Sequence, residues 1–535
     1  MKKVFILIIC IQIVSFVVGC HSGNSVYNIK DYGAKGDGKT INTSAINNTI
    51  RQCSGNGGGM VLIPSGTFVS GTILLLSNVN LHLDPGAILS GSKDTADYLL
   101  LKKVYFNEGY SRYGLIYSGD AHNVSITGNG EINGNGTYFM NGIDKPQLGR
   151  DYDRKFTRQG EDFMKQGSVI EDGPVSYNFR PGLMIIIERC ENIHIEDVVL
   201  RDSPEWTVKI GDCDDVNVHG ISILNNPLIP NNDGIHCTNS RNVRISDCNV
   251  IAGDDAIIVT GFSDQPSPTD PAWKVPSSGN KTGYAENITV DNCVLSSRSA
   301  CIRVGYGHHP IRNVIFSNLV MYDSNRGIGI FARDNSSIEN VLFTNIIINN
   351  RLHSGHWWGK GEPVHISSIK DSPNGVVGKI NNIRFYNIMA NSETGILIYG
   401  TKESQIDNIH FDKIQLTIHS GKYTTSYGGN FDLRPVFANE CAVFKHDIPG
   451  LYAQYVNKLS ISGMELNWDG RQAEFFTNGI EIRNFTDVSI NRFDGSAAFE
   501  TSGLSSIKAV DGSHLVIFDC TSTGKNPLVI KERVK

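Results

Sequence analysis

Two adjacent aspartates, Asp254 and Asp255, stand in "VIAGDDAIIVTG" (250–261), a run that is otherwise apolar and rich in β-branched residues. Burying two free carboxylates in a strand is costly, so the pair must leave the strand or find partners. A third carboxylate, Asp233 in "IPNNDGIHC", lies 21 residues before Asp254. Crowded carboxylates drive their pKa values apart, so that one stays protonated while another is ionised. This combination suits hydrolysis of a glycosidic bond, which needs an acid for the leaving oxygen and a base for water.

The position of the aspartate pair admits three interpretations. Strict alternation along a strand would send Asp254 and Asp255 to opposite faces, but the preceding Gly253 indicates a turn or bulge that lets both reach outward. With Asp233 they could then act as acid and base. Carboxylates in such loops also bind calcium together with backbone carbonyls, and aspartates in turns often pair only with backbone N–H groups. The residues alone leave catalysis, calcium binding and turn formation open.

A sequence repeat indicates the elements that must position these carboxylates. A short phrase recurs along the chain, as in "HNVSITG", "ENIHIED", "DDVNVHG", "RNVRISD" and "ENITVDN". Its apolar anchor falls at Val124, Ile193, Val216, Val243, Ile288, Val314, Val341, Ile383, Ile409, Leu459 and Val488. Several steps between anchors are 23 to 27 residues, and the step of 45 from Val243 to Ile288 fits two turns. A period of this size indicates a solenoid, and the alternation within each phrase indicates strands rather than helices.

We therefore expect an all-β fold, a parallel β-helix whose coils stack about 4.8 Å apart. Asp233 lies about one coil before Asp254, so stacking brings the three aspartates to one face. The open end of a solenoid needs a cap. The stretch "TINTSAINNTIRQC" (40–53) supplies an N-terminal capping helix, with Thr43 or Ser44 at its N-cap.

The first residues indicate a targeting segment rather than part of the fold. Two lysines precede an apolar run from Val4 to Gly19, which is typical of a secretory signal, and the run is short for a transmembrane anchor. Its end, "VVGC", resembles the lipobox of bacterial lipoproteins, which implies cleavage before Cys20 and lipidation of the Cys20 thiol. We expect a signal peptide over 1–19, a tether over 20–26, and an exported protein. A lipid anchor alone would hold it in the bacterial envelope, at the outer membrane surface or in the periplasm.

Several long stretches resemble glycoside hydrolase family 28, the polygalacturonase and rhamnogalacturonase group. They are "KDYGAKGDGKTINTSAINNTI", "GGGMVLIPSGTFVSGTILLLSNVNLHLDPGAILSGS", "FRPGLMIIIERCENIHIEDVVLRDSPEWTVKI", "NNDGI" and "GDD". The resemblance runs from about Tyr27 to Asn350 and more loosely to the end. It implies a single-stranded, right-handed, pectin-lyase-like β-helix over 27–535 and inverting hydrolysis of a pectic polysaccharide of the galacturonate or rhamnogalacturonan type. It also implies roles for the aspartates: Asp254 as general acid, and Asp233 and Asp255 as the pair that orients and deprotonates water. Carboxylates one coil apart are nevertheless closer than the usual spacing of inverting enzymes.

The sequence departs from the polygalacturonase pattern where that group binds its substrate. The histidine of its "GHG" motif falls on Ala300 in "SRSACIRVGYG" (297–307). Its Arg-Ile-Lys triplet, which grips the galacturonate carboxylate, matches "NRGIGIFARD" (325–334), where Gly329 and Phe331 replace the two cations. These changes argue against ordinary endo-polygalacturonase activity. They do not remove the chain from the family, because rhamnogalacturonan-cleaving members also depart from this pattern.

Neighbouring side chains are candidates to replace the lost substrate contacts. Arginine can fork onto a sugar carboxylate, although exposed arginine is also routine on such strands. The loop "RLHSGHWWGKGEPVHISS" (351–368) offers two tryptophans that could stack on a sugar ring, or else pack as plugs at the solenoid edge. The candidate substrate-binding residues are Arg303, Arg326, Arg333, His308, Trp357 and Trp358.

Three insertions interrupt the repeat, near 137–179, 264–283 and 351–364. Long insertions on a rigid scaffold usually serve function, and we expect these to form the walls of a cleft. The first could fold over the cleft and close one end, which favours exo action on oligosaccharides.

Composition limits the other functions. The chain of 535 residues carries a net charge of −6 and shows no basic stripe, so we expect no nucleic-acid partner. Its cysteines form no CxxC or zinc pattern, and we expect free thiols, no metal and no cofactor. The expected partner is a polysaccharide or oligosaccharide substrate, and the expected state is a monomer. Two alternatives to a hydrolase remain: a polysaccharide lyase, which needs a Lys or Arg base and often calcium, and a non-catalytic glycan-binding β-helix.

Overall fold

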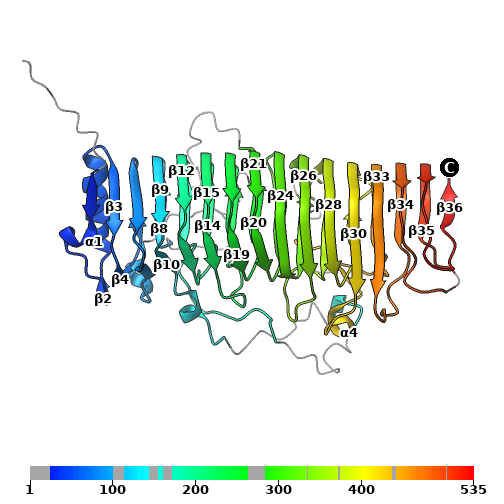
Figure 1. The fold of residues 1–535 in the computed structure, drawn as a ribbon, viewed down its shortest axis with the longest axis horizontal. Helices are drawn as coiled ribbons and strands as arrows, with labels where there is room; N and C mark the ends of the chain where they lie inside the picture. Colours follow the sequence, from blue (N-terminus) through cyan, green and yellow to red (C-terminus); the bar gives the residue numbers. More distant parts are fainter. Residues whose placement is uncertain are drawn as a thin grey trace, which may run out of the picture.

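The computed structural model describes residues 25–99, 114–143, 155–160, 171–262, 283–333, 335–370, 374–436, 441–501 and 503–535. Figure 1 shows a long solenoid whose turns lie side by side from α1 at one end to β36 at the other. One sheet assignment joins 34 strands, and the strand pairs described within it are parallel, as in β17 with β20. The predicted parallel β-helix is therefore confirmed.

Successive turns place their strands in three columns. The first column, which carries the three aspartates, consists of β5 (Ile73–Leu74), β8 (Ile116–Gly119), β11 (Ile185–Glu188), β14 (Val208–Gly211), β17 (Ile235–Thr238), β20 (Ile257–Gly261), β23 (Ala300–Gly307), β25 (Arg326–Ala332), β27 (Glu362–Ser368) and β29 (Ile396–Tyr399). The second consists of β1 (Val26–Asn28), β3 (Gly59–Ile63), β6 (Val79–Leu83), β9 (His122–Gly128), β12 (Glu191–Glu196), β15 (Asp214–His219), β18 (Arg241–Ser246), β21 (Ala285–Asp291), β24 (Ile311–Ser324), β26 (Ser337–Asn350), β28 (Lys379–Ser392) and β30 (Ile406–His419). The third consists of β2 (Asp37–Ile41), β4 (Gly66–Ser70), β7 (Ala87–Gly91), β10 (Glu131–Asn133), β13 (Val199–Arg201), β16 (Ser222–Leu224), β19 (Asn249–Ala252) and β22 (Val294–Ser297).

The columns merge toward the C-terminus because the strands become longer. β24 pairs with both β21 and β22, so it continues the second and third columns together. β33 (Leu451–Asp469) likewise pairs with both β29 and β30. The solenoid ends with β34 (Ile480–Asn491), β35 (Ile507–Phe518) and β36 (Val529–Val534).

The repeated phrase of the sequence forms the second column. Each predicted anchor is at most 1% exposed and pairs in register with the next, as Val216 does with Val243. The prediction that the step from Val243 to Ile288 spans two turns is wrong. These two residues pair directly, so a single turn contains all the residues between them.

In most coils an asparagine before the anchor forms the corner. Asn242, Asn287 and Asn313 have φ values of 55°, 58° and 57°, in the left-handed region that asparagine tolerates better than most residues. The side-chain amide of Asn287 donates to that of Asn242 at 3.2 Å, and Asn313 donates to Asn287 at 3.3 Å. The same residue type therefore turns the chain and ties each coil to its neighbour.

The helix α1 (Thr43–Gly55) packs on strands at the N-terminal end, as the predicted cap requires. Ile46 and Ile50 are fully buried there. The predicted N-cap at Thr43 or Ser44 is wrong, because Asn42 occupies that position. Thr43 lies inside the helix, where its hydroxyl accepts a hydrogen bond from the Gly71 N–H at 2.7 Å. One short 3-10 helix, η1 (Ile29–Tyr32), precedes it.

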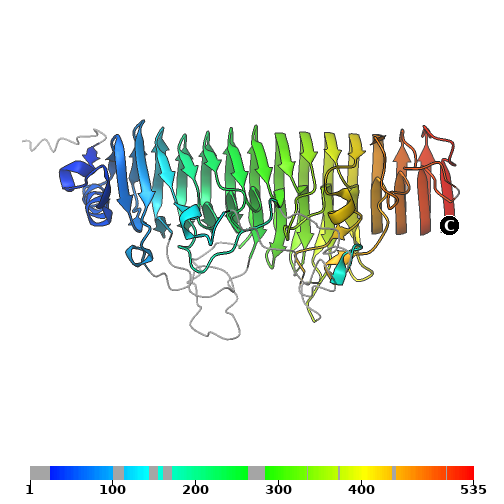
Figure 2. The same cartoon turned by 90° about the horizontal axis from the view of Figure 1, so that it is seen from below.

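Segments outside the coils gather on one side of the solenoid (Figure 2). They include η2 (Thr95–Asp97), η3 (Gly136–Phe139), α4 (Thr424–Tyr427), and the antiparallel pair β31 (Phe431–Asp432) and β32 (Val443–Phe444). The predicted signal peptide, Cys20 and nearly all of the 264–283 insertion lie outside the described residues. No helix in the described part of the chain has the length and apolar character needed to cross a membrane.

Candidate active site

The structure brings Asp233, Asp254 and Asp255 together. One carboxylate oxygen from each lies within 4.8 Å of the others. Ile235 pairs with Ile257, so Asp233 and Asp255, each two residues earlier, occupy equivalent positions on neighbouring coils. Asp254 is the residue immediately before Asp255. Asp233 and Asp255 are 3% and 2% exposed, whereas Asp254 is half-buried. Asp254 is therefore the carboxylate most open to a substrate.

The turn that carries the pair requires glycine. Residues 253–256 lie between β19 and β20, outside either strand, which confirms the predicted turn. The Gly253 N–H donates to the Asn232 side chain at 2.6 Å. A Cβ at Gly253 would stand 2.4 Å from the Ile229 carbonyl oxygen, a distance that real Cβ atoms do not reach. The glycine thus lets this turn pack against the preceding coil, which carries Asp233.

Arg303 supplies positive charge to the cluster. Its Nε lies 2.5 Å from Oδ2 of Asp255, and its guanidinium lies 3.9 Å from Oδ2 of Asp233. The other oxygen of Asp255 accepts a hydrogen bond from the Ala300 N–H at 2.9 Å. Both oxygens of Asp255 are therefore engaged by the protein. The oxygen Oδ1 of Asp233 is buried and has no hydrogen-bond partner among the described residues.

Burial and mutual repulsion raise the pKa of two of these carboxyls. Burial, followed by the charge of Asp255, raises the pKa of Asp254 to about 7, while Arg303 opposes this rise. Burial and the charges of Asp254 and Asp255 hold the pKa of Asp233 well above its usual value. A carboxyl that keeps its proton near neutral pH can act as a general acid. The half-buried Asp254 combines that property with access to substrate.

Sequence reasoning missed two side chains that complete this surface, His236 and Trp206. Nε2 of His236 lies 3.3 Å from Oδ2 of Asp233 and 3.2 Å from Arg303. Burial, with the charges of Arg303 and Lys209, holds the pKa of His236 well below its usual value, so the imidazole is neutral. The Trp206 ring stacks on His236 with 3.7 Å between centroids. The sequence signal for this contact was the three-residue spacing of Asp233 and His236 within "NNDGIHC". One residue stands just before a strand and the other just inside it.

Arg180 fixes the two loops that lead into this site. Its guanidinium donates to the carbonyl oxygens of Pro204 and Pro230 at 2.9 and 2.5 Å and to the Asn231 side chain at 3.1 Å. These loops precede Trp206 and Asp233. Nothing in the sequence pattern marked Arg180, because these partners, two of them backbone oxygens, lie in segments about 25 to 50 residues later.

Ala300 stands one coil beyond Asp255, since Ile257 pairs with Ile302. It is 1% exposed and contributes only its N–H to the cluster. Arg303, three residues later, supplies the guanidinium that contacts the carboxylates. The cationic group beside the aspartates therefore comes from position 303 of the same strand, β23, and not from position 300.

Arg326 and Arg333 lie under a covering segment rather than at an open surface. Arg326 donates to the Asp432 carbonyl oxygen at 2.9 Å and is 1% exposed. Arg333 is fully buried and donates to Pro435, Leu433 and Ser367. In this structure both guanidinium groups hold residues 432–435 onto the first column.

The two tryptophans and His308 differ in their surroundings. Trp357 is 4% exposed, and its indole N–H donates to the Asp172 carbonyl oxygen at 2.7 Å, so it packs as a plug. Trp358 is half-buried, and His308 is exposed. The structure therefore leaves Trp358 and His308 accessible among these three residues.

A wall over the first column consists of three interlocking segments. These are residues 155–160 with 171–172, residues 351–361, and residues 421–436 with 441–447. Asp172 pairs with His353 at 2.8 Å, and Arg434 donates to the Trp357 carbonyl oxygen at 2.7 Å. Arg158 pairs with Asp447 at 2.8 Å. Beneath this wall His365 and Leu397 are fully buried. The outward face of the column is thus covered from β25 to β29, directly beyond the coil of Arg303.

Similarity to known proteins agrees with this fold. The family model described as Glycosyl hydrolases family 28 matches residues 159–426, and the one described as Rhamnogalacturonase A/epimerase, pectate lyase-like matches residues 26–144. The exo-poly-alpha-D-galacturonosidase of Dickeya chrysanthemi is 29% identical over 339 residues, which are 55% of each chain. The polygalacturonase of Persea americana is 21% identical over 409 residues, 74% of this chain and 75% of that one. The chain spans about half the length of the first of these relatives.

Solved structures share the β-helix. The exopolygalacturonase of Thermotoga maritima superposes with a TM-score of 0.61 at 20% identity, covering 83% of this chain and 92% of that one. The family 28 exopolygalacturonase of Yersinia enterocolitica gives a TM-score of 0.57 at 18% identity, covering 96% and 78%. At these identities the likeness shows the fold.

Proposed function

Since the chain belongs to glycosyl hydrolases family 28, we propose that it hydrolyses glycosidic bonds in a pectic polysaccharide, or in oligosaccharides derived from it. The backbone would contain galacturonate, alone or alternating with rhamnose. The observation that carries this proposal is the carboxyl of Asp254, which is half-buried and has its pKa raised to about 7 beside two buried carboxylates. Such a group can donate a proton to a leaving sugar oxygen near neutral pH.

We assign Asp254 as the general acid and Asp233 with Asp255 as the pair that orients and deprotonates water, with inversion at the anomeric carbon. Arg303 and the Ala300 N–H engage Asp255, so Asp255 has a fixed orientation. Oδ1 of Asp233 has no partner in the described structure, which leaves it as an acceptor for a water proton. The oxygens lie closer than the roughly 6.5–9.5 Å typical of inverting enzymes, so the stereochemical outcome tests the assignment.

We propose exo action because the wall over β25 to β29 begins one coil beyond Arg303. At about 4.8 Å per coil, a polymer running along the first column would meet the wall within one sugar unit of the carboxylates. A chain end fits such a site, and an internal stretch of polymer does not. The similar proteins of Dickeya, Thermotoga and Yersinia are each named as exo-acting enzymes, which favours the same mode.

Substrate recognition should differ from that of common polygalacturonases. Gly329 and Phe331 carry no cation, and Arg326 and Arg333 bind the wall. Among the three candidate arginines and His308, Arg303 is the one placed against the carboxylates. We propose that Arg303, Trp206 and Trp358 contact the sugar, and that His308 lies at the edge of the cleft.

The N-terminal segment supports a further proposal about location. We propose export and attachment to the bacterial envelope through a lipid on Cys20, with the folded part as a monomer outside the cytoplasm. Mass spectrometry of the purified N-terminus would show a diacylglyceryl cysteine at position 20. An unmodified Cys20, or an intact N-terminus, would contradict it.

The activity can be tested on defined oligomers. Wild-type protein and the Asp254→Asn variant are incubated with di- to hexagalacturonate and with rhamnogalacturonan oligomers, and the products are separated by size. Release of one sugar unit at a time, lost in the variant, supports the exo-hydrolase. A growing ultraviolet absorbance from an unsaturated product would support a lyase, and tight binding without cleavage would support a non-catalytic glycan-binding protein.

A further inference from the structure

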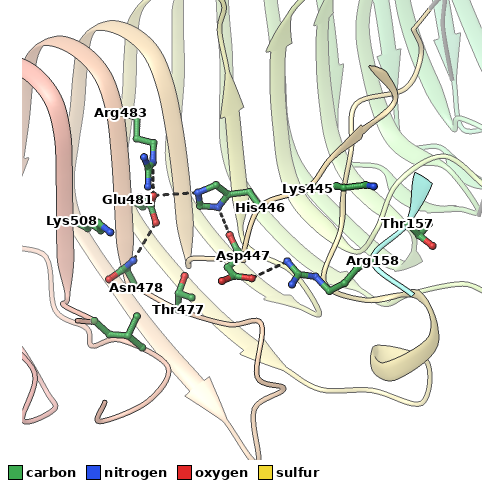
Figure 3. A pocket seen from close by; sticks show the side chains of 11 residues that line it. Thr157, Arg158, Lys445, His446, Asp447, Thr477, Asn478, Glu481, Arg483 and Lys508 are labelled. Carbon is green, nitrogen blue, oxygen red and sulfur yellow. Dashed lines mark hydrogen bonds and ion pairs between the residues drawn. The ribbon is translucent and has the colours of Figure 1, made fainter. Parts of the chain in front are cut away.

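A cavity lies on the outward face of the solenoid, at the edge of the wall that is farther from the aspartates. Its volume is about 610 Å³, within the range of small-molecule sites. Figure 3 shows it between β34, β35, the residues after β32 and the segment that carries Arg158. Its polar lining includes Thr157, Lys445, Thr477 and Lys508.

This cavity is separate from the three aspartates. The register of the first column leads from Arg303 through Gly329, His365, Leu397 and Tyr452 to Glu481. Five coils at about 4.8 Å place Glu481 about 24 Å from Arg303. His365, Leu397 and Tyr452 are at most 1% exposed, so covered residues separate the two places along this row.

The lining carries an excess of positive charge. Four of its side chains are cationic and two are carboxylates. The carboxylates already have partners, because Arg158 pairs with Asp447 at 2.8 Å and Arg483 pairs with Glu481 at 2.6 Å. The remaining cations are two lysines. Lys445 is exposed, and Lys508 lies 3.5 Å from Glu532, which is outside the lining.

Polar groups suited to sugar hydroxyls accompany these lysines. The hydroxyl oxygen of Thr477 is buried and has no hydrogen-bond partner among the described residues. The Asn478 side chain is fixed by bonds to Glu481 and Ser505, so this part of the lining is rigid. A buried hydroxyl without a partner costs free energy that a bound polar ligand can recover.

We propose that this cavity is a second carbohydrate site, which binds an oligosaccharide carrying carboxylates, such as an oligouronate. The two lysines lie on opposite sides of His446 in Figure 3, so a ligand with repeated carboxylates meets both. A single small anion meets one of them. This inference rests on the proposed function for the choice of uronate, and it assigns the cavity the task of holding the enzyme on polymeric substrate while a chain end is cleaved at the aspartates.

Binding is measured by titration calorimetry in the Asp254→Asn background, which prevents turnover. Hexagalacturonate should show two binding events. The double variant Lys445→Glu/Lys508→Glu should lose one of them, with an affinity loss of about tenfold or more, because charge-assisted contacts become repulsive. Lys525→Glu is the matched control, since Lys525 pairs with Glu500 and does not line the cavity. Thr477→Val, which keeps the charges, should weaken the same event severalfold.

The outcomes separate this site from the proposed activity. An isotherm that the double lysine variant leaves unchanged, whether it shows one binding event or two, overturns the second site. Equal binding of fully methyl-esterified hexamer, or full displacement by inorganic phosphate at equal concentration, also overturns it. With Asp254 intact, the double variant should cleave digalacturonate at the wild-type rate and show a raised KM for polygalacturonate. If the wild-type protein cleaves no pectic oligomer, and the double lysine variant still loses a binding event, the proposed function is refuted and the second site is supported.

Discussion

Replacing Arg303 with methionine should move the whole pH profile of activity upward. Arg303 lies 3.9 Å from Asp233 and 2.5 Å from Asp255, and its charge lowers the pKa of both Asp233 and Asp254. At an effective dielectric constant of about 20, a unit charge at 3.9 Å contributes about 4 kcal/mol. This equals about three pKa units as an upper bound, and solvent entering the vacated space reduces it.

The direction in which the pH profile moves follows from the role of each carboxyl. The alkaline limb of the profile reports the pKa of the general acid, Asp254, which must keep its proton. The acid limb reports the pKa of the base, which must lose its proton. Removing a nearby cation raises both pKa values, so both limbs move to higher pH, by about one unit for the half-buried Asp254. The maximal kcat should fall by about 100-fold, because Asp255 also loses its ion pair.

The assay is kcat against pH from about 4 to about 9 on an oligogalacturonide, with release of reducing ends as the signal. Arg303→Lys keeps the charge and should shift the limbs much less than the methionine variant. Arg312→Met removes an arginine that pairs with Glu286 at 2.7 Å, away from the aspartates, and should leave the profile unchanged. An alkaline limb that stays in place or moves to lower pH in Arg303→Met would refute this account of the cluster.

Three further predictions concern neighbouring residues. Asp254→Asn removes a carboxyl whose pKa is raised in the folded state, and this raised pKa makes the wild-type protein less stable as pH rises from about 4 to about 7. The thermal midpoint of the variant minus that of the wild type should therefore increase over that range. A decrease in this difference would contradict the raised pKa. Trp206→Ala removes the ring stacked on His236 and should raise KM about tenfold with little change in kcat; an equal fall in kcat would mean that the ring mainly positions His236. Arg333→Met breaks the hydrogen bonds that hold residues 433–435 and should lower the free energy of unfolding by about 3 kcal/mol in urea titrations; unchanged stability would show that the wall is held by other contacts.

The repeat predicts the fold because each coil repeats the same local physics. The anchor residues are buried by the neighbouring coil, and the residue before the anchor, in most coils an asparagine, turns the corner. The length of a turn is less predictable, as the direct pairing of Val243 with Ile288 shows. An insertion leaves the solenoid at one turn and returns to it, so spacing alone does not count coils.

The candidate site could be predicted only where its residues follow the coil period. Asp233, Asp254 and Asp255 do, and the structure brings them together. The role of Arg326 depends on a segment about 100 residues later, since its partner is Asp432, and no local pattern announces that contact. Trp357 is a plug for the same reason, because Asp172 from another insertion binds its indole N–H.

The most direct test of the central claim is proton NMR of the first product formed from an α-linked oligogalacturonide. Asp254 as acid, with Asp233 and Asp255 activating water, predicts that the new reducing end appears first as the β-anomer, before mutarotation produces the α-anomer. The short distance between the carboxylates makes this outcome a demanding one. An α-anomer formed first, or an unsaturated sugar, would contradict inverting hydrolysis by these three aspartates.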